Sequence, residues 1–152
     1  AASAAAPAAS PAASLAGQTI LVAEDNELNM GIVTELLTMS GAQVISAANG
    51  KQAVEKFQRS APYSVDAILM DMQMPVMDGC DAARAIRRLD RPDAATVPIV
   101  AVTANAFAED VARTTAAGMN AHVSKPIDMD RLLKALALCW AGRTPPAASP
   151  GE

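Results

Sequence analysis

The chain has 152 residues, 51% of them hydrophobic, which supplies enough apolar side chains for the core of one domain. The net charge of −4 disfavours nucleic-acid binding, and no apolar run approaches the ~18 residues that a membrane-spanning helix needs. No secretory signal is evident either, so we expect a cytoplasmic location for this part of the chain. The two cysteines, Cys80 and Cys139, lack metal-ligand spacing and are expected to be buried thiols.

Residues 1–17 and 143–152 have a low-complexity composition rich in Ala, Ser and Pro. Prolines break helices, and side chains this small bury little apolar surface. We therefore expect a flexible linker at each end and one folded unit over residues 18–142. Linkers on both sides are typical of a module within a multidomain chain.

Between these segments, short apolar runs alternate with segments whose apolar residues recur at helical spacing. In chain order, the expected elements are a strand at 19–23, a helix at 27–40, a strand at 43–47, a helix at 51–60, a strand at 67–70, a helix at 80–89, a strand at 98–102, a helix at 108–117, a strand at 121–123 and a helix at 128–140. The first helix is predicted from Leu28, Ile32, Leu36 and Met39. The pattern predicts an α/β fold, in which a doubly wound, five-stranded parallel sheet is flanked by five helices.

Polar residues follow four of the five predicted strands. Glu24 and Asp25 follow the first strand, Asp71 follows the third, Thr103 the fourth, and Lys125 lies just beyond the fifth. Because the carboxyl ends of parallel strands meet at one edge of a sheet, we expect these side chains to converge there. A helix cap, a turn residue or a surface charge would explain any one of them, but not the whole set.

This set of side chains has a chemical use. Three neighbouring carboxylates repel one another unless a cation binds, and their oxygens suit a hard ion such as Mg²⁺. A lysine and a hydroxyl group would stabilise charge on phosphoryl oxygens. We therefore expect Asp71, which ends the most apolar run, to be a nucleophile that forms an aspartyl phosphate.

The same residues lie within motifs that resemble the receiver domain of response regulators. The similar segments are ILVAEDNELN, DAILMDMQMPVMDG, VPIVAVTANA and GMNAHVSKPID, which follow one another in that order over residues 19–138. The residues of these segments are most similar to those of receivers fused to hybrid sensor histidine kinases. The resemblance implies a flavodoxin-like sheet with strand order 2-1-3-4-5, and a role in phosphorelay signal transduction.

The resemblance also implies a role for each acidic residue. Asp71 would be the phosphoacceptor and would contribute to a metal site. Asp25 would bind Mg²⁺ directly and Glu24 through water, with Mn²⁺ as an alternative ion. The backbone carbonyl of Gln73 would be the third protein ligand.

The remaining roles concern the switch and the phosphoryl group. The resemblance implies that Thr103 is the switch hydroxyl and that Lys125 contacts the phosphoryl group. Ala104 would leave room for that group, and Pro126 follows the lysine. His122 departs from the family pattern, because its position commonly holds the Tyr or Phe of a rotamer switch. This single histidine is either a partly exposed ring on the last strand or a polar switch.

Since no histidine lies in a kinase helix, the phosphoryl group must come from another domain or protein. The expected partners are a histidine kinase domain, in the same chain or another, and a histidine phosphotransfer protein; neither nucleic acid nor a membrane is an expected partner of this domain, although the parent chain could be membrane-anchored. The first helix is the expected docking face for the donor. No stand-alone enzyme is expected, only Mg²⁺-dependent self-phosphorylation and autodephosphorylation.

Three other functions remain open at this point. An aspartyl-phosphate phosphohydrolase is disfavoured because Gln73 cannot serve as its general acid. A nucleotide binder is disfavoured because neither glycine-rich phosphate-binding motif is present. The third is a receiver-like module that only binds proteins.

Overall fold

The computed structural model describes residues 15, 17–72, 74, 76–103, 108–125 and 127–141. Strands and helices alternate along the chain, and each predicted element is present with its ends within two residues of the predicted ones. The elements are β1 (Thr19–Ala23), α1 (Glu27–Met39), β2 (Gln43–Ala47), α2 (Gly50–Arg59), β3 (Ala67–Asp71), α3 (Gly79–Arg87), β4 (Ile99–Thr103), α4 (Ala108–Ala116), β5 (Ala121–Ser124) and α5 (Met129–Ala141).

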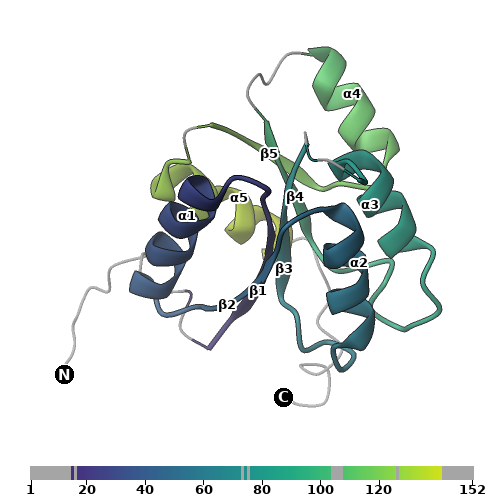
Figure 1. Cartoon of the computed structure of the whole chain (residues 1–152), viewed down its shortest axis with the longest axis horizontal. Helices are drawn as coiled ribbons and strands as arrows, with labels where there is room; N and C mark the ends of the chain where they lie inside the picture. The colour runs from purple at the N-terminus through teal and green to yellow at the C-terminus, as the bar shows by residue number, and fades with distance from the viewer. Residues whose placement is uncertain are drawn as a thin grey trace.

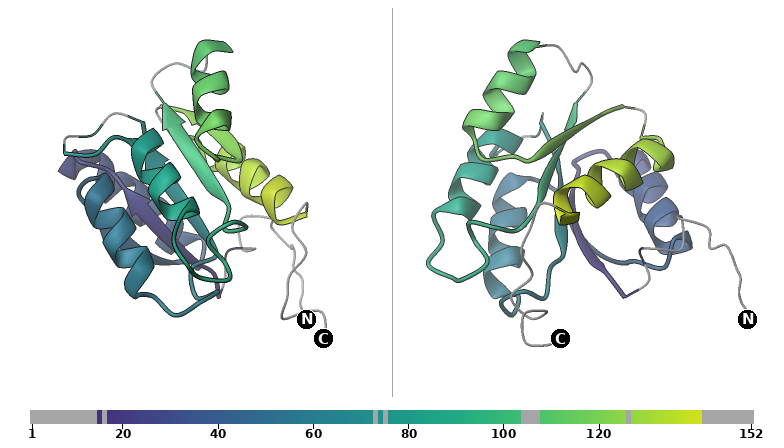
Figure 2. Two further views of the ribbon diagram at one scale, coloured as in Figure 1. Left: turned by 90° about the vertical axis from the view of Figure 1, so that its right-hand side faces the viewer. Right: turned by 180° about the vertical axis from the view of Figure 1, so that it is seen from behind.

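The strands form one parallel sheet in the order β2-β1-β3-β4-β5, which confirms the predicted topology. Figure 1 shows α1 and α5 on one face of this sheet and α2 and α3 on the other. Helix α4 lies beyond α3, next to the β4 and β5 side of the sheet, as the turned views also show (Figure 2). The fold is therefore doubly wound, and the carboxyl ends of all the strands share one edge.

Strand β3 shows why a continuous apolar run can form a strand. All five of its residues are buried. Ile68 and Met70 belong to the core cluster under α2 and α3, whereas Ala67 and Leu69 belong to the cluster under α1 and α5. Because successive side chains point to opposite faces, a strand covered on both sides needs apolar residues throughout.

Helix α1 has a different buried face from the one its apolar stripe suggests. Its buried side chains are Val33 and Leu37. Leu28, Ile32 and Met39, which helped to predict the helix, are 74%, 49% and 77% exposed. The helix is correctly predicted, but most of the stripe that predicted it faces outward.

The predicted N-terminal linker contains one core residue. Leu15 is fully buried and belongs to the core cluster under α1 and α5, and its carbonyl accepts a hydrogen bond of 3.0 Å from the Gln18 backbone N–H. The low-complexity composition gave no indication that Leu15 would be buried, and the boundary of the linker stays a prediction. Residues 1–14 and 142–152 lie outside the described residues, and for them the linkers stay a prediction.

A buried ion pair within the α3–β4 connection, at the opposite edge of the sheet, is hydrogen-bonded to the α2–β3 connection. Arg91 Nε lies 2.6 Å from Asp93 Oδ1, and these two side chains are 9% and 3% exposed. The Arg91 guanidinium also donates to the Ser60 carbonyl at 3.0 Å and lies 4.2 Å from the centre of the Phe57 ring. Burial alone would raise the pKa of Asp93, but hydrogen bonds from Arg91 and from the Tyr63 backbone N–H lower it below its ordinary value.

Two further expectations concern the cysteines and membranes. Cys80 is buried and Cys139 is half-buried, and both are thiols, as predicted. Over the described ranges, none of the helices combines the length and the apolar character that crossing a bilayer would require.

Candidate functional site

Three carboxylates meet at the carboxyl edge of the sheet. Glu24 and Asp25 directly follow β1, and Asp71 is the last residue of β3. These strands are neighbours, with Ala23 paired to Met70, so one carboxylate oxygen from each acid lies within 4.8 Å of the others. Glu24 and Asp71 are buried, whereas Asp25 is exposed. The structure thus brings together the three acids that the strand ends predicted.

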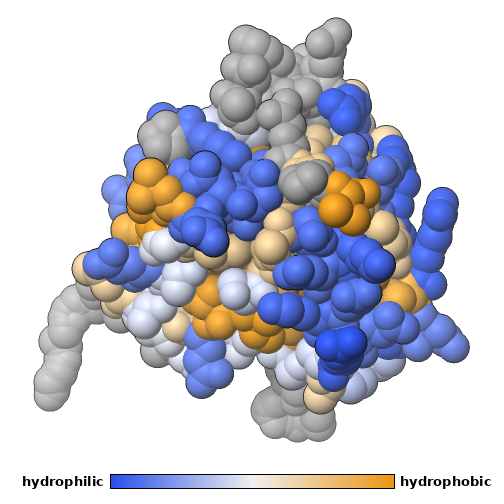
Figure 3. Space-filling view, viewed as in Figure 1, coloured by the Kyte–Doolittle hydropathy of each residue, from blue (hydrophilic) through white to orange (hydrophobic). Residues whose placement is uncertain are grey.

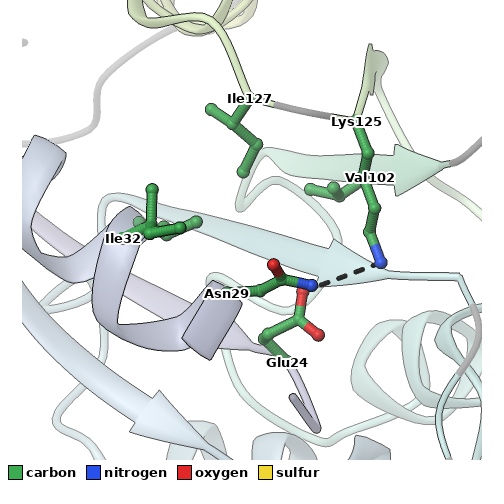
Figure 4. Close-up of a pocket in the computed structure, with 7 residues that line it drawn as sticks. Glu24, Asn29, Ile32, Val102, Lys125 and Ile127 are labelled. Atoms are coloured by element: carbon green, nitrogen blue, oxygen red, sulfur yellow. Dashed lines mark ion pairs between the residues drawn. The ribbon is translucent and has the colours of Figure 1, made fainter. Parts of the chain in front are cut away.

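Lys125 reaches the same cluster from the end of β5. Its Nζ lies 3.0 Å from Asp71 Oδ2 and 3.7 Å from Glu24 Oε1. Figure 4 shows the ion pair with Glu24. The Lys125 backbone N–H donates to the Thr103 carbonyl at 2.8 Å, and Thr103 is the buried last residue of β4. Four strand ends therefore contribute to one small region, as expected from the sequence.

The pKa values indicate an excess of negative charge at this edge. The pKa of Glu24 is raised by burial and by the neighbouring Asp71, although the Asn26 backbone N–H and Lys125 act against this. Burial alone would lower the pKa of Lys125, but its hydrogen bond to Asp71 and the charges of the acids raise it. One ammonium group faces three carboxylates, so a further cation would be stabilised here.

The donor set fits Mg²⁺ better than a softer metal. All three side chains offer carboxylate oxygens, and within the described part of the chain no histidine or cysteine joins this group. The exposed Asp25 keeps one side of the cluster open to water, which Mg²⁺ retains in its coordination shell. Gln73, whose carbonyl is the predicted third ligand, lies outside the described residues, as do Ala104 and Pro126.

The backbone around Asp71 is held by contacts that the sequence analysis missed. The Gly79 backbone N–H donates to the Met72 carbonyl at 3.3 Å, and Asp78 caps α3 by accepting from the Asp81 N–H at 2.9 Å. A Cβ at Gly79 would lie only 2.3 Å from the Asp71 carbonyl oxygen. Only glycine lets α3 begin this close to the strand that carries Asp71.

His122 lies on β5 and is half-buried. Its Nε2 forms a hydrogen bond with the hydroxyl of Thr114, a fully buried residue on α4. This contact joins α4 to β5 through polar groups, at the position where an aromatic ring was expected from the family pattern. The sequence carried no signal that identified Thr114.

A cavity of about 310 Å³ adjoins the acidic cluster. Figure 4 shows its walls, which are mostly apolar side chains from α1, β4 and the segment before α5. The lining residues are Glu24, Asn29, Ile32, Val33, Val102, Lys125 and Ile127. Because Glu24 and Lys125 belong to both, the cavity is continuous with the cluster.

Comparisons with known proteins match this geometry. The sequence model of the response regulator receiver domain family matches residues 20–137. The chain is 40% identical over 113 residues to "Hybrid signal transduction histidine kinase I" of Dictyostelium discoideum, which covers 73% of this chain and 6% of that protein. It is 38% identical over 117 residues to "Peroxide stress-activated histidine kinase mak1" of Schizosaccharomyces pombe, which covers 76% of this chain and 7% of that protein. The chain therefore spans a small part of these relatives.

Two solved structures are similar along nearly their whole length. The receiver domain of sensor histidine kinase PA1611 from Pseudomonas aeruginosa PAO1, with a magnesium ion coordinated in its active-site cleft, has a TM-score of 0.73 and 40% identity. The match covers 84% of this chain and 99% of that one. The chemotaxis protein CheY4 of Vibrio cholerae has a TM-score of 0.74 and 28% identity over 82% of this chain and 99% of that one.

Proposed function

Because this chain belongs to the response regulator receiver domain family, we propose that Asp71 is the residue on which it accepts a phosphoryl group. The chain is a receiver domain of two-component phosphorelay signalling. The observation that carries the proposal is the position of the Asp71 carboxylate, between two other acids and 3.0 Å from Lys125 Nζ. The Asp71 carboxylate can therefore be flanked by the Lys125 ammonium group and by a cation bound to the acids.

In the proposed reaction, a carboxylate oxygen of Asp71 attacks the phosphorus atom of a phosphohistidine. A P–O bond forms while the P–N bond breaks, and the imidazole nitrogen keeps the electron pair of the broken bond. The imidazole leaves neutral when its other nitrogen carries a proton. Lys125 stabilises charge on the transferred phosphoryl oxygens, and the Thr103 hydroxyl donates a hydrogen bond to them. The product is an aspartyl phosphate, a mixed anhydride.

The acids Glu24, Asp25 and Asp71 would hold Mg²⁺, with Mn²⁺ as an alternative ion and with the Gln73 carbonyl as a further ligand. When bound, the ion neutralises charge on the phosphoryl oxygens. The oxygen donor set supports this assignment, as does the magnesium ion in the similar receiver of PA1611.

Phosphorylation would change the packing of α4 and β5. The Thr103 hydroxyl would move toward the phosphoryl group, for which the small Ala104 would leave room, and Pro126 follows Lys125 in the sequence. His122 then acts as a polar switch, because its hydrogen bond to Thr114 joins the two elements that shift. The two packings differ in population, and the phosphoryl group favours one of them.

The partner that delivers the phosphoryl group would dock against α1. Leu28 and Ile32 leave apolar surface exposed on this helix, beside the cavity that ends at Glu24 and Lys125. Figure 3 shows a mostly hydrophilic face broken by separate apolar patches, one of them in the region of α1. Such a surface fits a helical domain that carries the phosphohistidine, either a histidine kinase domain or a histidine phosphotransfer protein. Neither nucleic acid nor a membrane is proposed as a partner, and the proposed site of action is the cytoplasm.

The test is the mass of the intact protein after incubation with acetyl phosphate. We expect a gain of one phosphoryl group that requires Mg²⁺ and is absent from Asp71→Asn. Asp25→Asn should weaken Mg²⁺ binding, so that phosphorylation needs a higher Mg²⁺ concentration. An unmodified wild-type mass at every Mg²⁺ concentration, or an equal gain in Asp71→Asn, would show that Asp71 is not the acceptor.

A further inference from the structure

Arg87, the last residue of α3, extends its guanidinium group to the turn between α4 and β5. Its Nε and Nη2 donate to the Gly118 carbonyl at 2.9 and 2.7 Å. Nη1 donates to the Ala94 carbonyl at 3.0 Å, and Nη2 also donates to Asn120 Oδ1 at 2.8 Å. Burial lowers the pKa of Arg87, but a guanidinium remains charged in proteins, and charged donors form the stronger hydrogen bonds. We call Arg87, Ala94, Gly118 and Asn120 the α4 clamp.

The α4 clamp lies at the C-terminal end of α4. The Met119 N–H returns to the Thr114 carbonyl at 2.9 Å, and Gly118 has a φ of +95°, so the helix ends in a left-handed turn. A Cβ at Gly118 would lie 2.9 Å from Arg87 Cγ. The glycine is therefore required both by the turn and by the arginine stem that lies against it. Thr114 and Met119 are buried, which adds packing at this same end of the helix.

The clamp also fixes this turn to the beginning of β4. Asn120 Oδ1 accepts a hydrogen bond from the Ile99 N–H at 2.8 Å, and the Asn120 N–H donates to the Ile99 carbonyl at 2.8 Å. Ile99 begins β4, and Thr103 ends the same strand inside the candidate site. Every residue of this strand is buried, so its two ends are joined by a rigid element.

We propose that the α4 clamp is a pivot: it holds the α4–β5 turn in place, so that phosphorylation moves only the N-terminal end of α4. This regulation rests on the proposed function, since it takes phosphorylation of Asp71 as its input. Charged hydrogen bonds to Gly118 and Asn120 of this turn and to Ala94 of the α3–β4 connection make the C-terminal end of α4 costly to displace. The switch residue Thr103 lies at the other end of β4, and the chain runs from there to the N-terminal end of α4.

Amide hydrogen exchange of the complete chain tests the pivot, with beryllofluoride and Mg²⁺ as the phosphoryl mimic. In the wild type, we expect the mimic to change exchange at residues 108–112 and to leave residues 117–120 within about twofold of their starting rates. In Arg87→Met, which keeps the apolar stem and removes every donor, residues 117–120 should exchange at least about tenfold faster. The mimic should then change exchange along the whole of α4.

Arg84→Met is the matched control, because Arg84 lies on the same helix, is 44% exposed and forms an ion pair with the exposed Asp81. It should behave like the wild type. Arg87→Lys replaces Arg87→Met if the latter does not fold. A single ammonium group cannot reproduce the bonds of the guanidinium to Ala94, Gly118 and Asn120, so exchange at residues 117–120 should still rise. The pivot is refuted if neither Arg87 variant raises that exchange, or if the mimic changes residues 117–120 of the wild type as much as residues 108–112. Phosphorylation of Arg87→Met by acetyl phosphate separates these outcomes from a failure of the proposed function, because Asp71 should still be modified.

Discussion

Gly79→Ala is the substitution that most directly tests how α3 positions Asp71. The added Cβ would lie 2.3 Å from the Asp71 carbonyl oxygen and 3.0 Å from Met72 Cα. Real Cβ contacts essentially never fall below 3.0 Å, so the backbone of β3 and the start of α3 must separate by at least 0.7 Å. Both neighbours are backbone atoms of buried residues, one at the end of β3 and one directly after it, so neither can move aside cheaply.

Two effects should follow from that displacement. Overpacking of this kind costs about 1–3 kcal/mol of the free energy of unfolding. A shift approaching 1 Å in a reacting group lowers rates by roughly 10–100-fold, so phosphorylation of Asp71 by acetyl phosphate should slow by that amount. Urea unfolding followed by circular dichroism measures the first effect, and the time course of intact mass measures the second.

Gly31→Ala is the control for the same chemical change. Gly31 lies inside α1 and is exposed, and a Cβ there would meet nothing within 4 Å. Alanine is the better helix former, so this variant should be stabilised by about 0.5–1 kcal/mol and phosphorylated at the wild-type rate. If Gly79→Ala matched Gly31→Ala in both measurements, α3 would not be what holds Asp71 in place.

Four further predictions concern charge and packing. Lys125→Met should slow phosphorylation by acetyl phosphate by ~100-fold, yet Mg²⁺ binding measured by calorimetry should be retained or tightened, because the ammonium group no longer competes for Asp71; weaker Mg²⁺ binding would count against this. Arg91→Met should cost about 3–5 kcal/mol in urea unfolding, because it leaves the buried Asp93 carboxylate unpaired. The pKa of Asp93 is lower in the folded protein than in the unfolded chain. Its carboxylate therefore stabilises the fold above the ordinary pKa, and this stabilisation is lost as the pH falls through the lowered pKa. In Asp93→Asn, the free energy of unfolding should fall less steeply below about pH 4. Leu15→Ala should cost about 2–5 kcal/mol, and an unchanged unfolding midpoint would mean that this segment is only a linker.

The elements were predictable because each of them carries a local signal. Strand β3 is apolar as far as Asp71, its last residue, and α2 is amphipathic, begins at the Asn49 cap and buries Phe57. The acids were predictable for a topological reason: in a parallel sheet, the residues that end the strands share one edge. Once the strands were placed, the proximity of Asp71 to Glu24 followed without any knowledge of side-chain geometry.

The missed contacts depend on residues that are distant in sequence. The partners of Arg87 lie up to 33 residues away, and Asp93 accepts from the Tyr63 N–H 30 residues before it. Nothing local distinguishes Arg87 from the exposed Arg84 one helical turn earlier, yet only Arg87 reaches the α4–β5 turn. Which arginine is buried is decided by packing between helices, and periodicity does not report it.

Helix α1 shows how one pattern can serve folding and function in different ways. Its core contacts come from Val33 and Leu37, whereas Leu28 and Ile32 keep much of their apolar surface in water. An isolated exposed apolar residue is ordinary, but Ile32 also lines the cavity that leads to Glu24 and Lys125. Binding of the proposed donor to this surface would remove apolar area from water next to the carboxylate that receives the phosphoryl group. The apolar residues from which the helix was predicted are then the ones that are available for binding. Periodicity located the helix, but it did not distinguish the residues that face the core from those that face a partner.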